Sequence, residues 1–155
     1  MIAGEYRPRV ASGFTLLEVL VALVVLSIGL LGLSGLQTNS LRNNHSAFLR
    51  SQATVVTNDI IDRMRANRDS ALAGGYNIAY AAATPAPGCI TGAIGCTAAA
   101  VASTDLFWWR SYVERLPAGE SDISFPVAGV AEIKVRWADA RDSANKLEIV
   151  TRAQL

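Results

Sequence analysis

A single carboxylate interrupts the most apolar stretch of the chain. Residues 14–36 read FTLLEVLVALVVLSIGLLGLSGL, and Glu18 is their only charged residue. A carboxylate within the hydrocarbon of a membrane is costly, so it usually marks a function or a partner. Glu18 is therefore the first candidate functional residue. The alternative is a glutamate that merely reaches the membrane interface.

Few other residues could support catalysis or metal binding. His45 is the only imidazole, and Cys89 and Cys96 are the only cysteines. These are too few for a zinc site built from cysteine and histidine. The sequence also holds no Walker loop, no G-x-S-x-G and no H-E-x-x-H. Because polar residues flank His45, its side chain is expected to be solvated. We therefore predict no enzyme, no cofactor and no metal site.

The charge pattern also argues against a polyanion-binding protein. The net charge is +1, and aspartates are interspersed among the arginines of residues 42–69. A helix face of mixed charge is usually just solvated. We therefore do not expect nucleic acid as a partner. An adhesive surface is compatible with the sequence, with residues 76–103 as its contact region, but no residue identifies a receptor.

The apolar stretch itself predicts a membrane helix. As a helix, its 23 residues would extend for about 35 Å, enough to cross a bilayer. Arg7 and Arg9 precede it and a long polar segment follows it, which predicts a cytoplasmic N-terminus. A cleaved secretory signal is the alternative, but its apolar region is shorter and ends in a small-residue cleavage site.

Three glycines, Gly29, Gly32 and Gly35, recur every third residue in this stretch. Small residues at such spacing let helices approach closely in lipid, and glycine also weakens a helix. Both effects suit a segment that packs with copies of itself. The alternative is that the glycines are simply tolerated in a membrane helix.

The helix is predicted to continue beyond the apolar stretch, because residues 37–69 contain no proline and no glycine. Their apolar residues form one stripe of an amphipathic helix. Together the two halves predict one helix of about 55 residues. The stripe is expected to pack on the C-terminal domain. It comprises Leu41, Phe48, Val55 or Val56, Ile60 and Met64.

The remaining residues predict a loop, a short helix and three strands. Residues 76–103 read as a loop, and 105–116 as a helix whose two tryptophans, Trp108 and Trp109, are core anchors. The strands are expected at 123–127, 131–138 and 146–152, joined by a hairpin turn at Ala128-Gly129 and a polar loop over 139–145. These elements predict an α+β fold, in which a long N-terminal helix packs on a small antiparallel sheet.

Residues 13–18, GFTLLE, closely resemble the type IV prepilin signature. In that family a short basic leader ends in glycine, here Gly13, and an apolar residue, here Phe14, begins the mature chain. A glutamate at the fifth mature position corresponds to Glu18. The resemblance implies that a membrane-embedded prepilin peptidase cuts between Gly13 and Phe14 and N-methylates the new amine of Phe14. It also implies the same helix-and-sheet fold.

The resemblance gives a physical role to Glu18. Cleavage creates an α-amine that is mainly cationic at neutral pH. An amine and a carboxylate facing each other in hydrocarbon neutralise one another, whereas either charge alone is costly. In the family, this glutamate is thought to meet the amine of a neighbouring subunit during assembly. Glu18 is therefore expected to set the register between subunits.

The expected domain organisation follows from the same topology. A cleaved leader at 1–13 precedes a transmembrane or filament-core helix at 14–36 and its amphipathic continuation at 37–70. Residues 71–155 form a periplasmic or extracellular globular domain. Cys89 and Cys96 then lie in an oxidising compartment, which favours a disulfide between them. Two unpaired structural cysteines are the alternative.

A narrower resemblance is to the PilV subfamily of minor pilins, the type IV pilus modification proteins. It rests on residues 58–67, NDIIDRMRAN, the cysteine-bearing loop, the short helix after it and the LPAG turn at 116–119. It implies a minor pilin that helps to initiate a type IV pilus for adhesion and twitching motility. A minor pseudopilin of a type II secretion system or a pilin-like DNA-uptake subunit is the alternative.

The same resemblance implies the partners and the location of the protein. The partners are the prepilin peptidase, other minor and major pilins, the inner-membrane assembly platform and membrane lipid. The protein is expected to cross the inner membrane once and then to pass into the pilus at the cell surface.

Overall fold

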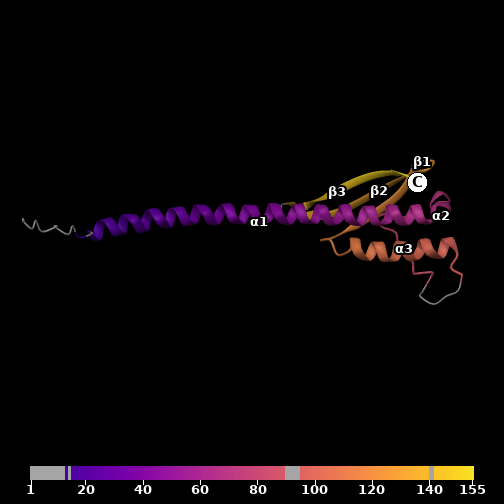
Figure 1. Ribbon diagram of the computed structural model, residues 1–155, viewed down its shortest axis with the longest axis horizontal. Coiled ribbons are helices and arrows are strands. Elements are labelled where there is room, and N and C mark those ends of the chain that lie inside the picture. Colours follow the sequence, from indigo (N-terminus) through magenta and orange to yellow (C-terminus); the bar gives the residue numbers. More distant parts are fainter. Residues whose placement is uncertain (1–12, 14, 90–94, 140–141) are drawn as a thin grey trace, which may run out of the picture. The chain divides into compact units, whose positions relative to one another are not determined.

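The computed structural model describes residues 13, 15–89, 95–139 and 142–155, with only the backbone described at 142–145. The chain divides into two compact units, Met1–Leu41 and Arg42–Leu155, with the boundary inside the first helix. The elements in chain order are α1 (Leu16–Ala66), α2 (Arg68–Leu72), α3 (Ala98–Val113), β1 (Glu120–Val127), β2 (Val130–Asp139) and β3 (Asp142–Gln154) (Figure 1).

The N-terminal unit consists of the first part of α1. Every residue from 16 to 41 is exposed, and an 18-residue window of the helix reaches a mean hydropathy of 2.7. The hydroxyls of Ser27 and Thr38 donate to carbonyls four residues earlier, at 2.7 and 3.0 Å. Since these polar groups are satisfied within the helix, the segment is compatible with hydrocarbon. By length and composition α1 can cross a membrane, as the sequence predicted.

The second part of α1 packs in the globular unit. Its buried side is narrow and includes small or polar residues as well as large apolar ones. The buried residues are Ser46, Leu49, Ala53, Thr57, Ile60, Ile61 and Met64.

The predicted apolar stripe was therefore only partly right. Ile60 and Met64 are buried, and Val56, the alternative to Val55, is partly buried against the core. Leu41, Phe48 and Val55 are 69%, 57% and 63% exposed. Small side chains occupy the core-facing positions between the large ones because they allow the helix to lie close to its neighbours.

The end of α1 also differs from the prediction. The helix stops at Ala66, before the predicted end at Asp69. Asn67 leaves the helical conformation with φ −117° and ψ 50°, and the short α2 follows it.

The sheet is an antiparallel meander with the strand order β1-β2-β3. In β2, Ala131, Ile133, Val135 and Trp137 are fully buried, which confirms the period-two pattern of the sequence. Val127 pairs with Val130, so Ala128-Gly129 forms the expected two-residue turn. Gly129 has φ +76°, a conformation that suits glycine in this turn.

The strands are longer than predicted. β1 begins at Glu120, and Asp139 of β2 pairs with Asp142 of β3. The predicted polar loop over 139–145 was therefore wrong, because β3 starts four residues earlier than expected. Polar residues can continue a hairpin where one face of the ladder is exposed to solvent.

Helix α3 begins at Ala98, where the sequence predicted a loop, and not at Asp105. Thr97 caps it, since its hydroxyl accepts the N–H of Ala100 at 3.2 Å. Trp109 is fully buried as predicted, whereas Trp108 is 50% exposed, so its predicted core role was wrong. The indole N–H of Trp109 donates to the carbonyl of Val56 at 3.0 Å and thereby joins α3 to α1.

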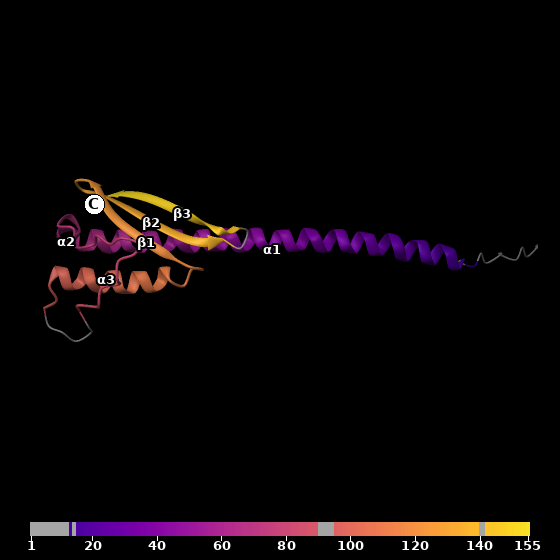
Figure 2. The same cartoon turned by 180° about the vertical axis from the view of Figure 1, so that it is seen from behind.

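One hydrophobic core unites the globular unit. It takes residues from α1, α3 and the inner face of the sheet. In both views, the second part of α1 lies between the sheet and α3 (Figures 1 and 2). Ser46 of α1 donates to a carboxylate oxygen of Asp139 at 2.9 Å, which ties the helix to the end of β2. The α+β fold predicted from the sequence is confirmed.

Candidate processing and assembly site

The start of α1 is fixed by Thr15. Its side-chain hydroxyl accepts the backbone N–H of Glu18 at 3.2 Å, and its carbonyl accepts the same N–H at 3.1 Å. Threonine followed three residues later by glutamate is the spacing of a capping box. The sequence reading missed this role of Thr15, although the T-x-x-E spacing was the signal for it. Glu18 therefore lies in the first turn of the helix, where a negative charge is favourable.

Gly13 is exposed and has no regular secondary structure. Phe14, the predicted first mature residue, lies outside the described residues, as does the predicted leader up to residue 12. Because Thr15 also lies outside the helix, the bond after Gly13 precedes the helical segment.

Glu18 and the three predicted packing glycines all lie on the exposed surface of α1. A methyl group added at Gly29, Gly32 or Gly35 would meet no atom of the chain within 4 Å. Nothing in the described part of the isolated chain therefore requires glycine at these three positions.

A polar network joins the end of α1 to α3. Arg63 contacts Asp59 at 2.9 Å and Asp105 at 3.0 Å. Tyr76 donates its phenolic hydrogen to Asp105 at 2.6 Å, and Asn67 donates to Tyr76 at 3.2 Å. Burial and then the bond to Asp105 raise the pKa of Tyr76. The sequence reading missed this network, because it joins residues from three segments.

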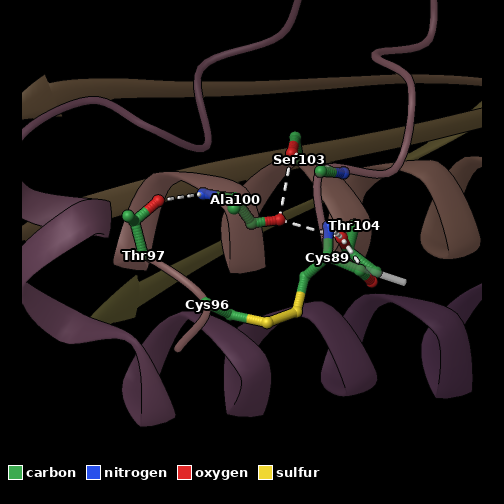
Figure 3. The surroundings of a disulfide bond; sticks show 7 residues. Cys89, Cys96, Thr97, Ala100, Ser103 and Thr104 are labelled. Atoms are coloured by element: carbon green, nitrogen blue, oxygen red, sulfur yellow. Dashed lines mark hydrogen bonds between the residues drawn. A yellow bond between two sulfur atoms is a disulfide. The ribbon is translucent and has the colours of Figure 1, made fainter. Parts of the chain in front are cut away.

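A disulfide between Cys89 and Cys96 closes the loop before α3 (Figure 3). Their Cα atoms are 5.8 Å apart, within the usual range for a disulfide. Two hydroxyls of α3 hold the start of the loop. Thr104 accepts the N–H of Cys89 at 2.9 Å, and Ser103 accepts the N–H of Gly88 at 3.2 Å. The predicted disulfide thus joins Cys89 to Cys96, and the two hydrogen bonds tie Gly88 and Cys89 to α3.

The segment after α2 is held by one buried cation, Arg110 of α3, which is 6% exposed. Its guanidinium donates to the backbone carbonyls of Ala79, Tyr80, Ala82 and Ser121. Burial lowers the pKa of Arg110. The interaction is made with main-chain oxygens, so it fixes the path of this segment and the start of β1 together.

The described residues offer no catalytic or metal-binding constellation. No group of three or more histidine, cysteine, aspartate or glutamate residues could hold a metal ion in the described ranges. His45 is exposed on α1, as expected. Its neighbour Ser46 is buried instead, so the polar surface around His45 is smaller than the sequence suggested.

Two sequence families match adjoining parts of the chain. Residues 8–34 match the prokaryotic N-terminal methylation motif, and residues 35–107 match type IV pilin Tt1218. The 27 residues of the first match and the 73 of the second make 100 of the 155 residues. The chain matches no curated protein and no solved structure.

Helix α1 thus combines an exposed apolar part with a part that packs in a helix-and-sheet unit. Together with the two matches, this architecture shows that the chain belongs to the type IV pilin-like family. Type IV pilins are structural subunits and not enzymes. The protein is therefore a membrane-anchored pilin that becomes part of a pilus. Its methylation motif implies processing by a prepilin peptidase and assembly with other pilins.

Proposed function

We propose that this protein is a minor pilin, which helps to initiate a type IV pilus and is incorporated into it. The observation that carries the proposal is the GFTLLE motif, whose last three residues begin an exposed apolar helix. The resemblance of residues 58–67, the disulfide loop and the LPAG turn to PilV proteins supports the minor-pilin role. Such a subunit serves adhesion and twitching motility through the filament that it starts.

The proposed maturation has two steps. The peptidase hydrolyses the bond between Gly13 and Phe14, so that water gives a carboxylate on Gly13 and a free amine on Phe14. A methyl donor then methylates that amine, which keeps its positive charge. The mature chain begins two residues before α1, so the capping hydroxyl of Thr15 is retained.

Glu18 would then guide assembly. A methylated amine and a carboxylate are each costly in hydrocarbon, and pairing them between two subunits removes both unpaired charges. Because only one alignment of the two helices brings the amine and the carboxylate together, each subunit leaves the inner membrane in a fixed register with its neighbour. The exposed Gly29, Gly32 and Gly35 allow neighbouring helices to pack closely beside it.

The proposed domain organisation places the protein across the inner membrane before assembly. The leader at 1–13 is cytoplasmic, residues 14–36 cross the bilayer, and residues 37–70 continue the helix outside it. The globular domain at 71–155 is periplasmic, where its disulfide is stable. The inner-membrane assembly platform then transfers the subunit into the pilus at the cell surface.

Mass spectrometry of sheared filaments tests this proposal. The expected result is an N-terminus at methylated Phe14, with fewer copies of this protein than of the main subunit. An intact Met1 in the filament fraction would refute the processing step, and equal abundance would refute the minor role. Gly13→Val should block cleavage, because a branched side chain replaces the glycine at the cut.

A minor pseudopilin of a type II secretion system is the second candidate, since the motif and the helix fit it equally well. Recovery with secretion components rather than with sheared pili would favour it. DNA uptake has less support. On the outer face of the sheet, Glu120 pairs with Arg136 and Lys146, and Glu132 pairs with Lys134 and Arg152. Basic side chains paired in this way are poor ligands for phosphates.

A further inference from the structure

The two edges of the sheet differ in how they are covered (Figures 1 and 2). On the β1 edge, Ile123 donates its N–H to the carbonyl of Ile78 at 2.8 Å and accepts the N–H of Ile78 at 3.0 Å. Arg110 donates to the carbonyl of Ser121 on the same edge. Strand β3 forms the other edge and pairs with β2 alone in the described part of the chain. An open edge of this length is a template for pairing with a further strand.

The register of the sheet shows which backbone groups of β3 are free. In an antiparallel pair, successive residues direct their N–H and C=O groups alternately toward the partner strand and away from it. Ile123 directs both groups away from β2, toward Ile78. The same alternation, followed through the paired residues of the three strands, directs Ile149 and Thr151 toward β2. The backbone groups that point outward from β3 are therefore those of Lys146, Glu148, Val150 and Arg152.

The side chains along this edge complement those of a second copy. In an antiparallel pair of two β3 strands centred on Val150, Glu148 of each copy lies opposite Arg152 of the other. Arg152 already contacts Glu132 at 2.6 Å, but its side chain is 69% exposed, so it can bind a second carboxylate. Opposed residues of opposite charge stabilise a sheet. Because both members of each pair direct their backbone groups outward, each pair can also exchange two main-chain hydrogen bonds.

We propose that β3 pairs with β3 of a second copy of this chain, which extends the sheet across a two-fold axis at Val150. The interface uses the same surface of both copies, as in most symmetric protein pairs. Val150 is 52% exposed and would lie opposite the same residue of the other copy. The inference goes beyond the proposed function but rests on it, since the subunit must be part of a filament.

The pairing determines the relative direction of the two copies. Ser46 of α1 bonds to Asp139, which pairs with the first residue of β3, and Arg68 bonds to the carbonyl of Leu155 just after β3. Strand β3 therefore runs in the same direction as the part of α1 that packs beside the sheet. Two antiparallel β3 strands hold these helices in opposite directions, whereas subunits inserted in one membrane share a direction. The second copy therefore belongs to an oppositely directed filament, and the contact joins two pili.

Disulfide trapping in the full chain tests the proposal. Val150→Cys places a thiol at the axis, where the Cα atoms of an opposed pair lie about 5.5 Å apart, within the range of a disulfide. Val127→Cys is the matched control, because Val127 lies on β1 and is 62% exposed. Two cell populations that carry differently tagged copies are mixed before oxidation. Val150→Cys should give at least about tenfold more dimers that contain both tags than Val127→Cys gives.

The filament fraction of the same cells separates the two proposals. Equal yields from the two cysteine variants, or dimers formed only within each population, would overturn the pairing. If the protein is present in sheared filaments but gives no dimer with both tags, only the pairing is refuted. If it is absent from filaments, the proposed function fails and the pairing between pili fails with it.

Charge reversal in the Val150→Cys chain gives an independent readout. Glu148→Lys places a lysine opposite Arg152 twice in a pair of identical copies, so it should lower the dimer yield about tenfold. Arg152→Glu should have a similar effect, because it places two carboxylates opposite each other. A mixture of one population of each variant again opposes a cation to a carboxylate at both positions, so mixed dimers should recover. Unchanged yields for the single variants, or no recovery in the mixture, would contradict the pairing of Glu148 with Arg152.

Discussion

Trp109 stabilises the contact between α3 and α1 through both its ring and its indole N–H. The ring is fully buried, and the N–H donates to the carbonyl of Val56. Trp109→Phe removes the indole donor and part of the buried ring, so the Val56 carbonyl keeps only its bond within α1 and the core loses contacts. We expect the free energy of unfolding to fall by about 1–3 kcal/mol. Chemical denaturation of the full chain in detergent, followed by fluorescence, measures this change.

The neighbouring tryptophan provides the control. Trp108→Phe changes the same type of residue one position earlier, where the side chain is 50% exposed. The expected change is within about 0.5 kcal/mol. Equal effects of the two substitutions would contradict the assignment of Trp109, and not Trp108, to the core.

Glu120 makes the stability of the sheet dependent on pH. Its hydrogen bond with Lys146, and then its bond with Arg136, hold the pKa of Glu120 below its ordinary value. The carboxylate of Glu120 is therefore protonated less readily in the folded state than in the unfolded state. The stabilising contribution is present above the ordinary glutamate pKa of about 4.3 and is lost as the pH falls through the lower folded value.

Glu120→Gln removes this titration. We expect the variant to unfold at a lower temperature than the unchanged protein at pH 7, with the difference shrinking below about pH 4. Melting curves across this pH range measure the effect. Salt at about 1 M should also reduce the difference, because these ion pairs are partly exposed to solvent. A difference that stays constant with pH would refute the role of the charge.

At the scale of elements, the disulfide closes the segment between Cys89 and Cys96, which precedes α3. The closed loop is short, so the entropy model gives a stabilisation of about 2.5 kcal/mol. Cys89→Ser combined with Cys96→Ser should lower the unfolding free energy by that amount. Denaturation of the unchanged protein under reducing conditions should give the same midpoint as the double variant. An unchanged midpoint in both experiments would contradict a structural role.

At this scale the sequence predicted the type of each element better than its ends. The strict alternation in β2 identified its buried face correctly, because period two leaves no choice of face. The alanine-rich start of α3 looked like a loop, since it has no apolar periodicity, yet alanine is the strongest helix former. The start of α3 depends on the cap formed by Thr97, and this role is evident only in the folded chain.

Helix α1 shows why a hydrophobic pattern alone misplaced the buried face. Ser46 and Thr57 are buried because they satisfy their hydroxyls, one with Asp139 and the other with the carbonyl of Ala53. Phe48 and Val55 are more apolar, yet they remain exposed. A partner 93 residues away, such as Asp139 for Ser46, cannot be identified by local periodicity.

For the whole molecule, assembly is expected to depend on one carboxylate. Glu18→Ala should leave membrane insertion intact, because it makes the apolar helix more apolar. It should lower incorporation into filaments by at least about tenfold, since the amine of the neighbour stays unpaired. Quantitative blotting of membrane and sheared-filament fractions measures both effects. Glu114→Ala, which removes an exposed carboxylate after α3, is the control, and normal incorporation of Glu18→Ala would show that this charge is dispensable.

The residues of the candidate site differ in whether the sequence alone could identify them. Gly13, Phe14 and Glu18 lie within six residues, so the motif could be recognised from the sequence alone. The network of Arg63, Asp105 and Tyr76 brings together distant segments. Only packing determines such neighbours, and the sequence pattern could not predict them.

The buried guanidinium of Arg110 has a consequence for how this protein can diversify. It recognises the carbonyl oxygens of Ala79, Tyr80 and Ala82, and every amino acid carries such an oxygen, so this anchor of the segment does not depend on side-chain identity. Substitutions there can remodel the outward surface while the backbone keeps its course. A single retained cation in α3 would thus allow the exposed side chains of this segment to change over evolution at little cost to the fold.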